Sequence, residues 1–131
     1  MAMFLFTDAI LNNKPIDVFN NGNLSRDFTY IDDIVQGVVS TLLKDSKNSN
    51  LYKLYNIGNG KPVQLLDFIE SLEKVLDITA TKNMLPMQDG DVYQTFASTS
   101  KLEHDFEYKP QTKVDDGINK FVKWYKNFYN I

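Results

Sequence analysis

Five segments of the chain carry apolar residues at the three- and four-residue spacing of an amphipathic helix. The segment from residue 30 shows this spacing clearly. A second helix signal is the position of Asp32 and Asp33 in its first turn, where the helix dipole favours carboxylates. Thr29 precedes that segment and is a candidate N-cap. Helices are therefore predicted over residues 3–11, 30–44, 63–76, 101–106 and 114–129, the fourth after a hydroxyl cap at residues 98–100.

Shorter apolar runs lie between these helices and are bounded by turn residues. They predict strands over residues 16–19, 24–28, 52–57 and 78–85, with a polar loop at 45–50 and a turn at 88–90. Asn21-Gly22 is a strong hairpin signal, so we expect the first two strands to form a hairpin. Helices that alternate with short strands indicate an α/β or α+β fold. We expect a small sheet with four to five helices packed around it, and not a complete doubly wound sheet.

Composition narrows the class of protein. A chain of 131 residues fits one domain, and 43% hydrophobic residues suffice for a packed core. The net charge of −3 argues against nucleic acid as a partner. Without cysteine and with a single histidine, His104, the sequence has no disulfide framework and no ligand set for a zinc site. No run of eighteen apolar residues and no signal peptide is present, so we expect no membrane segment and a cytoplasmic location.

The most informative chemical feature is Arg26, at the end of the second predicted strand and just before a helix. An arginine stays charged at every working pH, and its donors suit a phosphate group. A strand, an arginine and a capped helix could therefore form a diphosphate clamp. The alternative is a surface arginine paired with Asp27 or Asp32.

Several motifs occur in the order found in the NAD-dependent epimerase/dehydratase family, and the chain resembles the C-terminal part of its members. The motifs are the run from Ile16 to Val35, Tyr55-Asn56-Ile57-Gly58, the run from Pro62 to Ile69, the run from Met84 to Val92, and Tyr108-Lys109-Pro110-Gln111-Thr112. The segment Pro86-Met87-Gln88, followed by Gly90-Asp91-Val92, resembles the UDP-glucuronate 4-epimerase branch. The resemblance implies the C-terminal part of a Rossmann-type epimerase, with residues 1–131 forming a single sugar-nucleotide-binding domain.

The family's chemistry is hydride transfer with bound NAD, assisted by a Tyr-x-x-x-Lys pair. None of the seven tyrosines is followed by lysine four positions later, and the six glycines do not form a G-x-x-G-x-x-G run. Gly58-Asn59-Gly60 resembles a nucleotide loop, but a turn requires glycine anyway. We therefore expect the dinucleotide-binding half to be absent, and this chain alone to bind no NAD, to lack catalytic residues and to be inactive.

The resemblance also implies a binding site for a UDP-sugar. Arg26 corresponds to the arginine that contacts the diphosphate, and Asp91 to the carboxylate that reaches the ribose hydroxyls. Val18 and Phe19 correspond to the strand against the uracil, where backbone groups pair with the base and the aromatic ring packs on it. Gln88 stands where many relatives carry a second phosphate-binding arginine. Without the resemblance, Phe19 would be read as core and Asp91 as a turn residue.

Three functional hypotheses remain open. The chain is the substrate-binding part of an NAD-dependent sugar-nucleotide 4-epimerase, a non-catalytic binding or interaction module, or an inactive fragment. The first helix begins without a cap, which suggests truncation. If the dinucleotide-binding half is missing, its absence should expose an apolar surface. We therefore expect self-association, with the first helix exchanged between copies.

Overall fold

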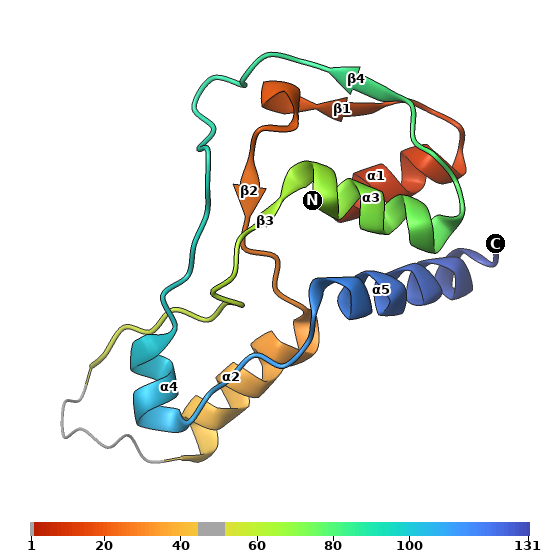
Figure 1. The fold of residues 1–131 in the computed structure, drawn as a ribbon. Coiled ribbons are helices and arrows are strands. Elements are labelled where there is room, and N and C mark those ends of the chain that lie inside the picture. The colour runs from red at the N-terminus through yellow and green to blue at the C-terminus, as the bar shows by residue number, and fades with distance from the viewer. Residues whose placement is uncertain (1, 45–51) are drawn as a thin grey trace.

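The computed structural model describes residues 2–44 and 52–131 (Figure 1). The loop expected at residues 45–50 lies outside the described residues. The elements, in chain order, are α1 (Ala2–Leu11), β1 (Ile16–Val18), the 3₁₀ helix η1 (Phe19–Gly22), β2 (Ser25–Arg26), α2 (Ile31–Leu43), β3 (Val63–Gln64), α3 (Leu65–Leu76), β4 (Lys82–Met84), α4 (Ser100–Phe106) and α5 (Val114–Tyr129). All five predicted helices are confirmed, and none of the helices described is long and apolar enough to cross a membrane.

The strands form two small sheets. β1 runs parallel to β4, with Val18 opposite Met84, and the two lie side by side along one edge of the molecule in Figure 1. β2 pairs antiparallel with β3. The predicted hairpin is therefore wrong, because β1 and β2 do not pair with each other. Asn20, Asn21 and Gly22 have φ values of 50°, 49° and 81°, and this left-handed run directs the chain away from β1.

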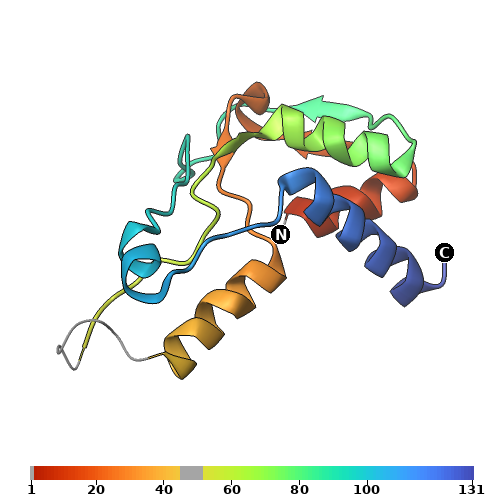
Figure 2. The same cartoon turned by 60° about the horizontal axis from the view of Figure 1, so that its bottom comes forward.

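The main core lies between α1, α3, α5 and the β1–β4 sheet. Figure 2 shows α1 and α5 crossing beneath α3. On α3, most of the apolar positions at helical spacing are buried, but Leu66 is exposed. The buried residues are Leu65, Phe68, Ile69, Leu72 and Leu76 of α3, together with Ile118, Val122 and Tyr125 of α5. Phe4 of α1 packs edge-on against Tyr125 with ring centroids 5.2 Å apart. These contacts bury the apolar faces that each helix would otherwise expose.

A second, smaller core lies where α4 packs against α2. Leu102, Phe106 and Tyr108 are buried there, and the half-buried Tyr55 and Ile57 pack against them. Asp105 is buried beside this cluster and accepts hydrogen bonds from Lys53 and from the hydroxyl of Tyr55, the latter at 2.6 Å. This ion pair attaches α4 to the segment that precedes residue 58.

The ends of several elements differ from the predictions. Residues 52–57 are extended but have no strand partner among the described residues, so the predicted strand there is wrong. Strand 78–85 is confined to Lys82–Met84, and helix 63–76 begins only at Leu65, because Val63 and Gln64 pair with β2. The two hydroxyl caps are also wrong. Tyr30 and Thr99 occupy the N-cap positions of α2 and α4, and neither side chain caps the helix.

Asp105 should contribute to stability in a pH-dependent way. Its hydrogen bonds from Lys53 and then from Tyr55 lower the pKa of its carboxyl group below its usual value. A depressed carboxyl pKa stabilises the fold above the unfolded-state pKa of about 4, and the contribution is lost as the pH falls through the folded-state pKa. Urea unfolding of Asp105→Asn should therefore show a deficit relative to the unsubstituted chain that is constant from about pH 5 to 7 and shrinks below about pH 4.

Glu103→Gln is the matched control, because Glu103 is exposed on the same helix. It should leave the free energy of unfolding nearly unchanged across this range. A deficit of Asp105→Asn that stays the same on acidification would contradict the assigned role of the ion pair.

Candidate functional site

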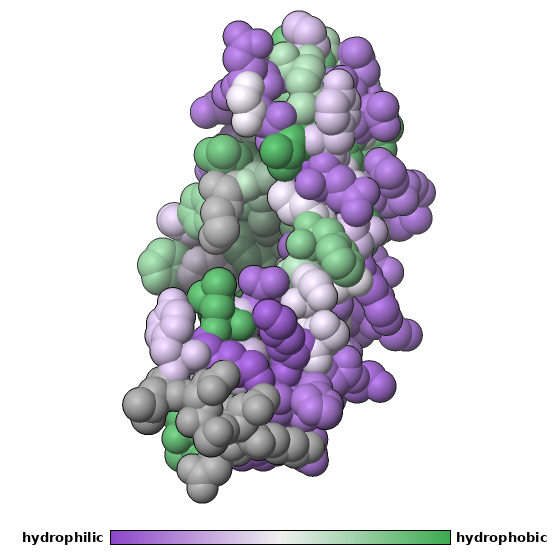
Figure 3. Space-filling model, turned by 90° about the vertical axis from the view of Figure 1, so that its left-hand side faces the viewer, coloured by the Kyte–Doolittle hydropathy of each residue, from purple (hydrophilic) through white to green (hydrophobic). Residues whose placement is uncertain are grey.

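A groove of about 1100 Å³ opens between α1, α5 and the connection from β2 to α2. Its wall is mostly apolar and includes the aromatic rings of Phe4, Phe28, Phe121 and Trp124. Figure 3 shows a hollow with hydrophobic side chains around it between the upper and lower parts of one face. Arg26 and Asp91 form a polar patch in this apolar wall. A mostly apolar concavity with a few convergent polar groups is the usual form of a ligand site.

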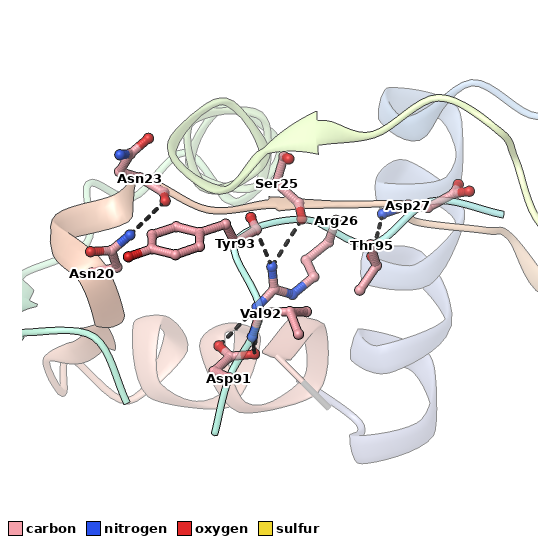
Figure 4. Close-up of polar contacts among 9 residues, drawn as sticks. All are labelled: Asn20, Asn23, Ser25, Arg26, Asp27, Asp91, Val92, Tyr93 and Thr95. Carbon is pink, nitrogen blue, oxygen red and sulfur yellow. Dashed lines mark hydrogen bonds and ion pairs between the residues drawn. The ribbon is translucent and has the colours of Figure 1, made fainter. Parts of the chain in front are cut away.

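Arg26 is held by Asp91 and by two backbone carbonyl groups (Figure 4). Its Nη2 atom lies 2.8 Å from both Oδ1 and Oδ2 of Asp91. Its Nη1 atom donates to the carbonyl oxygens of Ser25 at 2.9 Å and Tyr93 at 3.4 Å. The sequence analysis considered Asp27 or Asp32 as the partner of Arg26, and that alternative is wrong. The partner is Asp91, 65 residues away along the chain.

Asp27, next to Arg26, fastens two distant segments to the end of β2. Its carboxylate accepts hydrogen bonds from the backbone amides of Asn59 at 3.1 Å, Gly60 at 3.0 Å and Ala97 at 2.9 Å. Its own amide donates to Oγ1 of Thr95 at 3.0 Å. The stretch that carries Tyr93, a partner of Arg26, is thereby fixed against β2.

The five residues predicted for binding do not all reach the groove. Phe19, Arg26 and Asp91 line it. Val18 is completely buried, and its carbonyl oxygen accepts the amide of Leu85 at 3.0 Å, so it does not line the groove. Gln88 is exposed and lies outside the groove lining, although its carbonyl accepts the Asp91 amide at 3.2 Å.

Asp33 has a structural role that its position in the first turn of α2 did not reveal. It is buried, and its carboxylate accepts the amides of Gln111 at 3.0 Å and Thr112 at 3.1 Å. Nearby, the hydroxyl of Tyr108 donates to the carbonyl of Gly58 at 3.1 Å. Burial, followed by the negative charges of Asp33 and Asp27, raises the pKa of Tyr108. Its hydroxyl therefore stays protonated and keeps this hydrogen bond.

Comparison with known proteins gives the family. The profile of the NAD dependent epimerase/dehydratase family matches residues 1–58. Protein CapI of Staphylococcus aureus is 44% identical over 98% of this chain, and a probable UDP-glucuronate 4-epimerase of Rhizobium meliloti is 41% identical over the same share. The chain belongs to the NAD dependent epimerase/dehydratase family. It spans only 43% and 42% of those two relatives.

Comparison with solved structures supports the same family. The crystal structure of UDP-glucuronic acid 4-epimerase from Bacillus cereus, in complex with UDP-glucuronic acid and NAD, superposes with a TM-score of 0.89. The two sequences are 35% identical, and the match covers 98% of this chain and 40% of the Bacillus protein. The chain corresponds to the C-terminal part of this Rossmann-type epimerase fold.

The Bacillus cereus enzyme was crystallised with NAD, and the Gly58–Gly60 turn is the segment of this chain that resembles a dinucleotide loop. A pyrophosphate loop must direct backbone amides at the ligand. Here the amides of Asn59 and Gly60 both donate to the carboxylate of Asp27. A side chain at Gly58 would place its Cβ 2.4 Å from that of Ala97, so glycine serves close packing at this position. The turn does not fit a dinucleotide.

The sequence analysis missed the structural importance of Asp27, Thr29 and Asp33. The Oγ1 atom of Thr29 accepts the amide of Asn59 at 3.1 Å instead of capping α2. A short polar side chain beside a strand end or a helix start often bonds distant backbone amides, and this general tendency was the only available signal. The sequence did not identify which amides these side chains bind.

Replacement of Asp27 by alanine should loosen the site as well as the fold. Three backbone amides would lose a charged acceptor, which we expect to cost about 2–4 kcal/mol of unfolding free energy. Asp32→Ala is the matched control, because Asp32 is exposed and its ion pair with Lys120, also exposed, is long at 3.8 Å. It should cost less than about 1 kcal/mol in the same urea titration. Equal losses in the two variants would contradict the role assigned to Asp27.

Proposed function

We propose that the chain is the nucleotide-sugar-binding part of an NAD-dependent 4-epimerase that acts on a UDP-glucuronate or UDP-galacturonate type of substrate. The observation that carries the proposal is the Arg26–Asp91 pair in the wall of the apolar groove. Arg26 would contact the diphosphate, and Asp91 would accept hydrogen bonds from the ribose diol, since one carboxylate can accept two at once. The 35% identity to an enzyme crystallised with UDP-glucuronic acid and NAD supports this substrate class.

Three further residues were predicted to contact the ligand, one through an aromatic ring, one through its backbone and one through a side-chain amide. Phe19 lines the groove and would pack against the uracil ring. Val18 is buried and could contribute only through its backbone. Gln88 lies outside the groove lining, so its proposed contact requires the turn at residues 88–90 to move towards the ligand. Gln88 could donate a hydrogen bond but would bring no charge.

In this proposal, a dinucleotide-binding half outside residues 1–131 would carry out the redox chemistry. NAD would belong to that half, since the Gly58–Gly60 turn does not fit it. The alternative is a non-catalytic binding module or an inactive fragment, which the lack of Tyr-x-x-x-Lys in the sequence favours for these 131 residues taken alone. The mass of the native polypeptide separates the two, because a species well above 15.1 kDa would indicate the longer enzyme.

Titration of the 131-residue chain with UDP and with UDP-glucuronic acid tests the proposal. We expect weak binding, with a dissociation constant of about 1 mM, because much of the contact surface of the relatives lies outside this chain. Arg26→Ala should abolish the heat of binding. Lys101→Ala removes an exposed cation on α4 and should bind like the unsubstituted chain. Equal affinities of the Arg26 and Lys101 variants would remove Arg26 from the site.

We also propose that the chain associates with itself. The outer face of α2 exposes a row of aliphatic side chains, among them Ile31, Val35, Leu42 and Leu43, which are 51–81% exposed. Sedimentation velocity should show dimers or larger species as the concentration rises, because water disfavours such a surface. Leu43→Glu should shift the distribution to monomer, whereas Val92→Glu, on an exposed loop, should not. A monomer at all concentrations would contradict the proposal.

A further inference from the structure

Most N–H donors of the Arg26 guanidinium already have hydrogen-bond partners within the chain. Arg26 is the only arginine of the chain, and a guanidinium carries five N–H donors. Nη1 donates to two backbone carbonyl oxygens, and Nη2 donates to both carboxylate oxygens of Asp91 (Figure 4). Within residues 2–44 and 52–131, only Nε has no hydrogen bond assigned to it. A diphosphate therefore has to replace an existing partner of Arg26 to gain more than one hydrogen bond.

Asp91 is the partner that can leave. The carbonyls of Ser25 and Tyr93 belong to the backbone, and Tyr93 also accepts the Ser25 amide at 2.9 Å, so the chain fixes their place. Asp91, by contrast, contributes a side chain that is 33% exposed. It follows Gly90, which has a φ of 81° and no atoms of other residues within 4 Å of the place where a Cβ would lie. The carboxylate can thus rotate away from Arg26 without disturbing a core, either keeping or giving up one local hydrogen bond, from the amide of Val92 to Oδ1 at 2.8 Å.

We infer that Asp91 is an internal competitor of the diphosphate and a residue that sets specificity for nucleotides. The inference rests on the proposed function of Arg26. A diphosphate would take over Nη2 and release the carboxylate of Asp91, which then becomes free to accept the ribose hydroxyls. A nucleoside diphosphate compensates for the lost ion pair with the diol contact. Inorganic pyrophosphate breaks the same pair and offers no such compensation.

Calorimetric titrations of pyrophosphate, UDP and 2′-deoxy-UDP against three proteins test this inference. The proteins are the unsubstituted chain, Asp91→Asn and Asp89→Asn. Asp89→Asn is the matched control, because it removes an exposed carboxylate of the same charge two residues away. Thermal unfolding of each variant checks that the fold is retained, and Asp91→Ala repeats the test without an amide that could still bond to Arg26.

We expect Asp91→Asn and Asp91→Ala to bind pyrophosphate at least threefold more tightly than Asp89→Asn does. We also expect them to lose the preference of the unsubstituted chain for UDP over 2′-deoxy-UDP. Pyrophosphate affinities equal to that of Asp89→Asn would overturn the inference, while an Arg26-dependent affinity for UDP would leave the proposed function intact. If the unsubstituted chain binds none of the three ligands, the proposed function fails and the inference fails with it.

Discussion

The site depends on the carboxylate of Asp27 and the three backbone amides that it binds. These amides come from the turn at residues 58–60 and from Ala97, at sequence separations of 32–70 residues from Asp27. The four strands in the described part of the chain have only two or three residues each, so the ladders contribute few long-range hydrogen bonds. The carboxylate of Asp27 therefore provides some of the long-range hydrogen bonds that a wider sheet provides in other α/β folds. Because Arg26 is the next residue, its place in the groove follows from this fastening.

The Arg26–Asp91 pair is held from both sides. Oδ1 of Asp91 also accepts the amide of Val92 at 2.8 Å, and Nη1 of Arg26 is bound to backbone carbonyls. A partly exposed ion pair by itself contributes little to stability, typically about 0–1 kcal/mol. The additional backbone contacts therefore explain the defined geometry better than the charge attraction does. An arginine that is oriented in advance loses less conformational entropy when a ligand arrives.

Local patterns predicted the helices well, because the spacing of apolar residues is a property of each segment alone. α5 has the predicted bounds, and α1 and α2 agree within one residue at each end. Pairing between strands is not local, and here the predictions failed. Residues 52–57 alternate between exposed and half-buried positions as a strand would, yet a strand also needs a partner that the pattern does not specify. The Asn-Gly signal correctly marked a turn, but three successive residues of positive φ gave it another direction.

Prediction of the candidate site from the sequence was limited in the same way, because its contacts are not local. Arg26 was recognisable from its chemistry and position, whereas Asp91 became a candidate only through the family resemblance, since a carboxylate after glycine is ordinary in a turn. Their contact with each other was not expected from either source. Asp27 was considered only as an ion-pair partner, although its amide contacts decide the geometry. Side chains that bind distant backbone amides leave no periodic signal in the sequence.

The charges around the groove limit how well these residues could hold an anion by themselves. Among the described residues, the lining includes four aspartates, Asp8, Asp17, Asp27 and Asp91, but only two cations, Arg26 and Lys113. A diphosphate placed far from Arg26 would meet a net negative wall in a groove whose apolar surfaces screen charge poorly. In the proposed complex, the anionic part of the ligand would therefore lie beside Arg26, and the rest of the ligand would extend along the aromatic wall. Tighter binding of the proposed ligand would require positive charge in addition to Arg26 and Lys113.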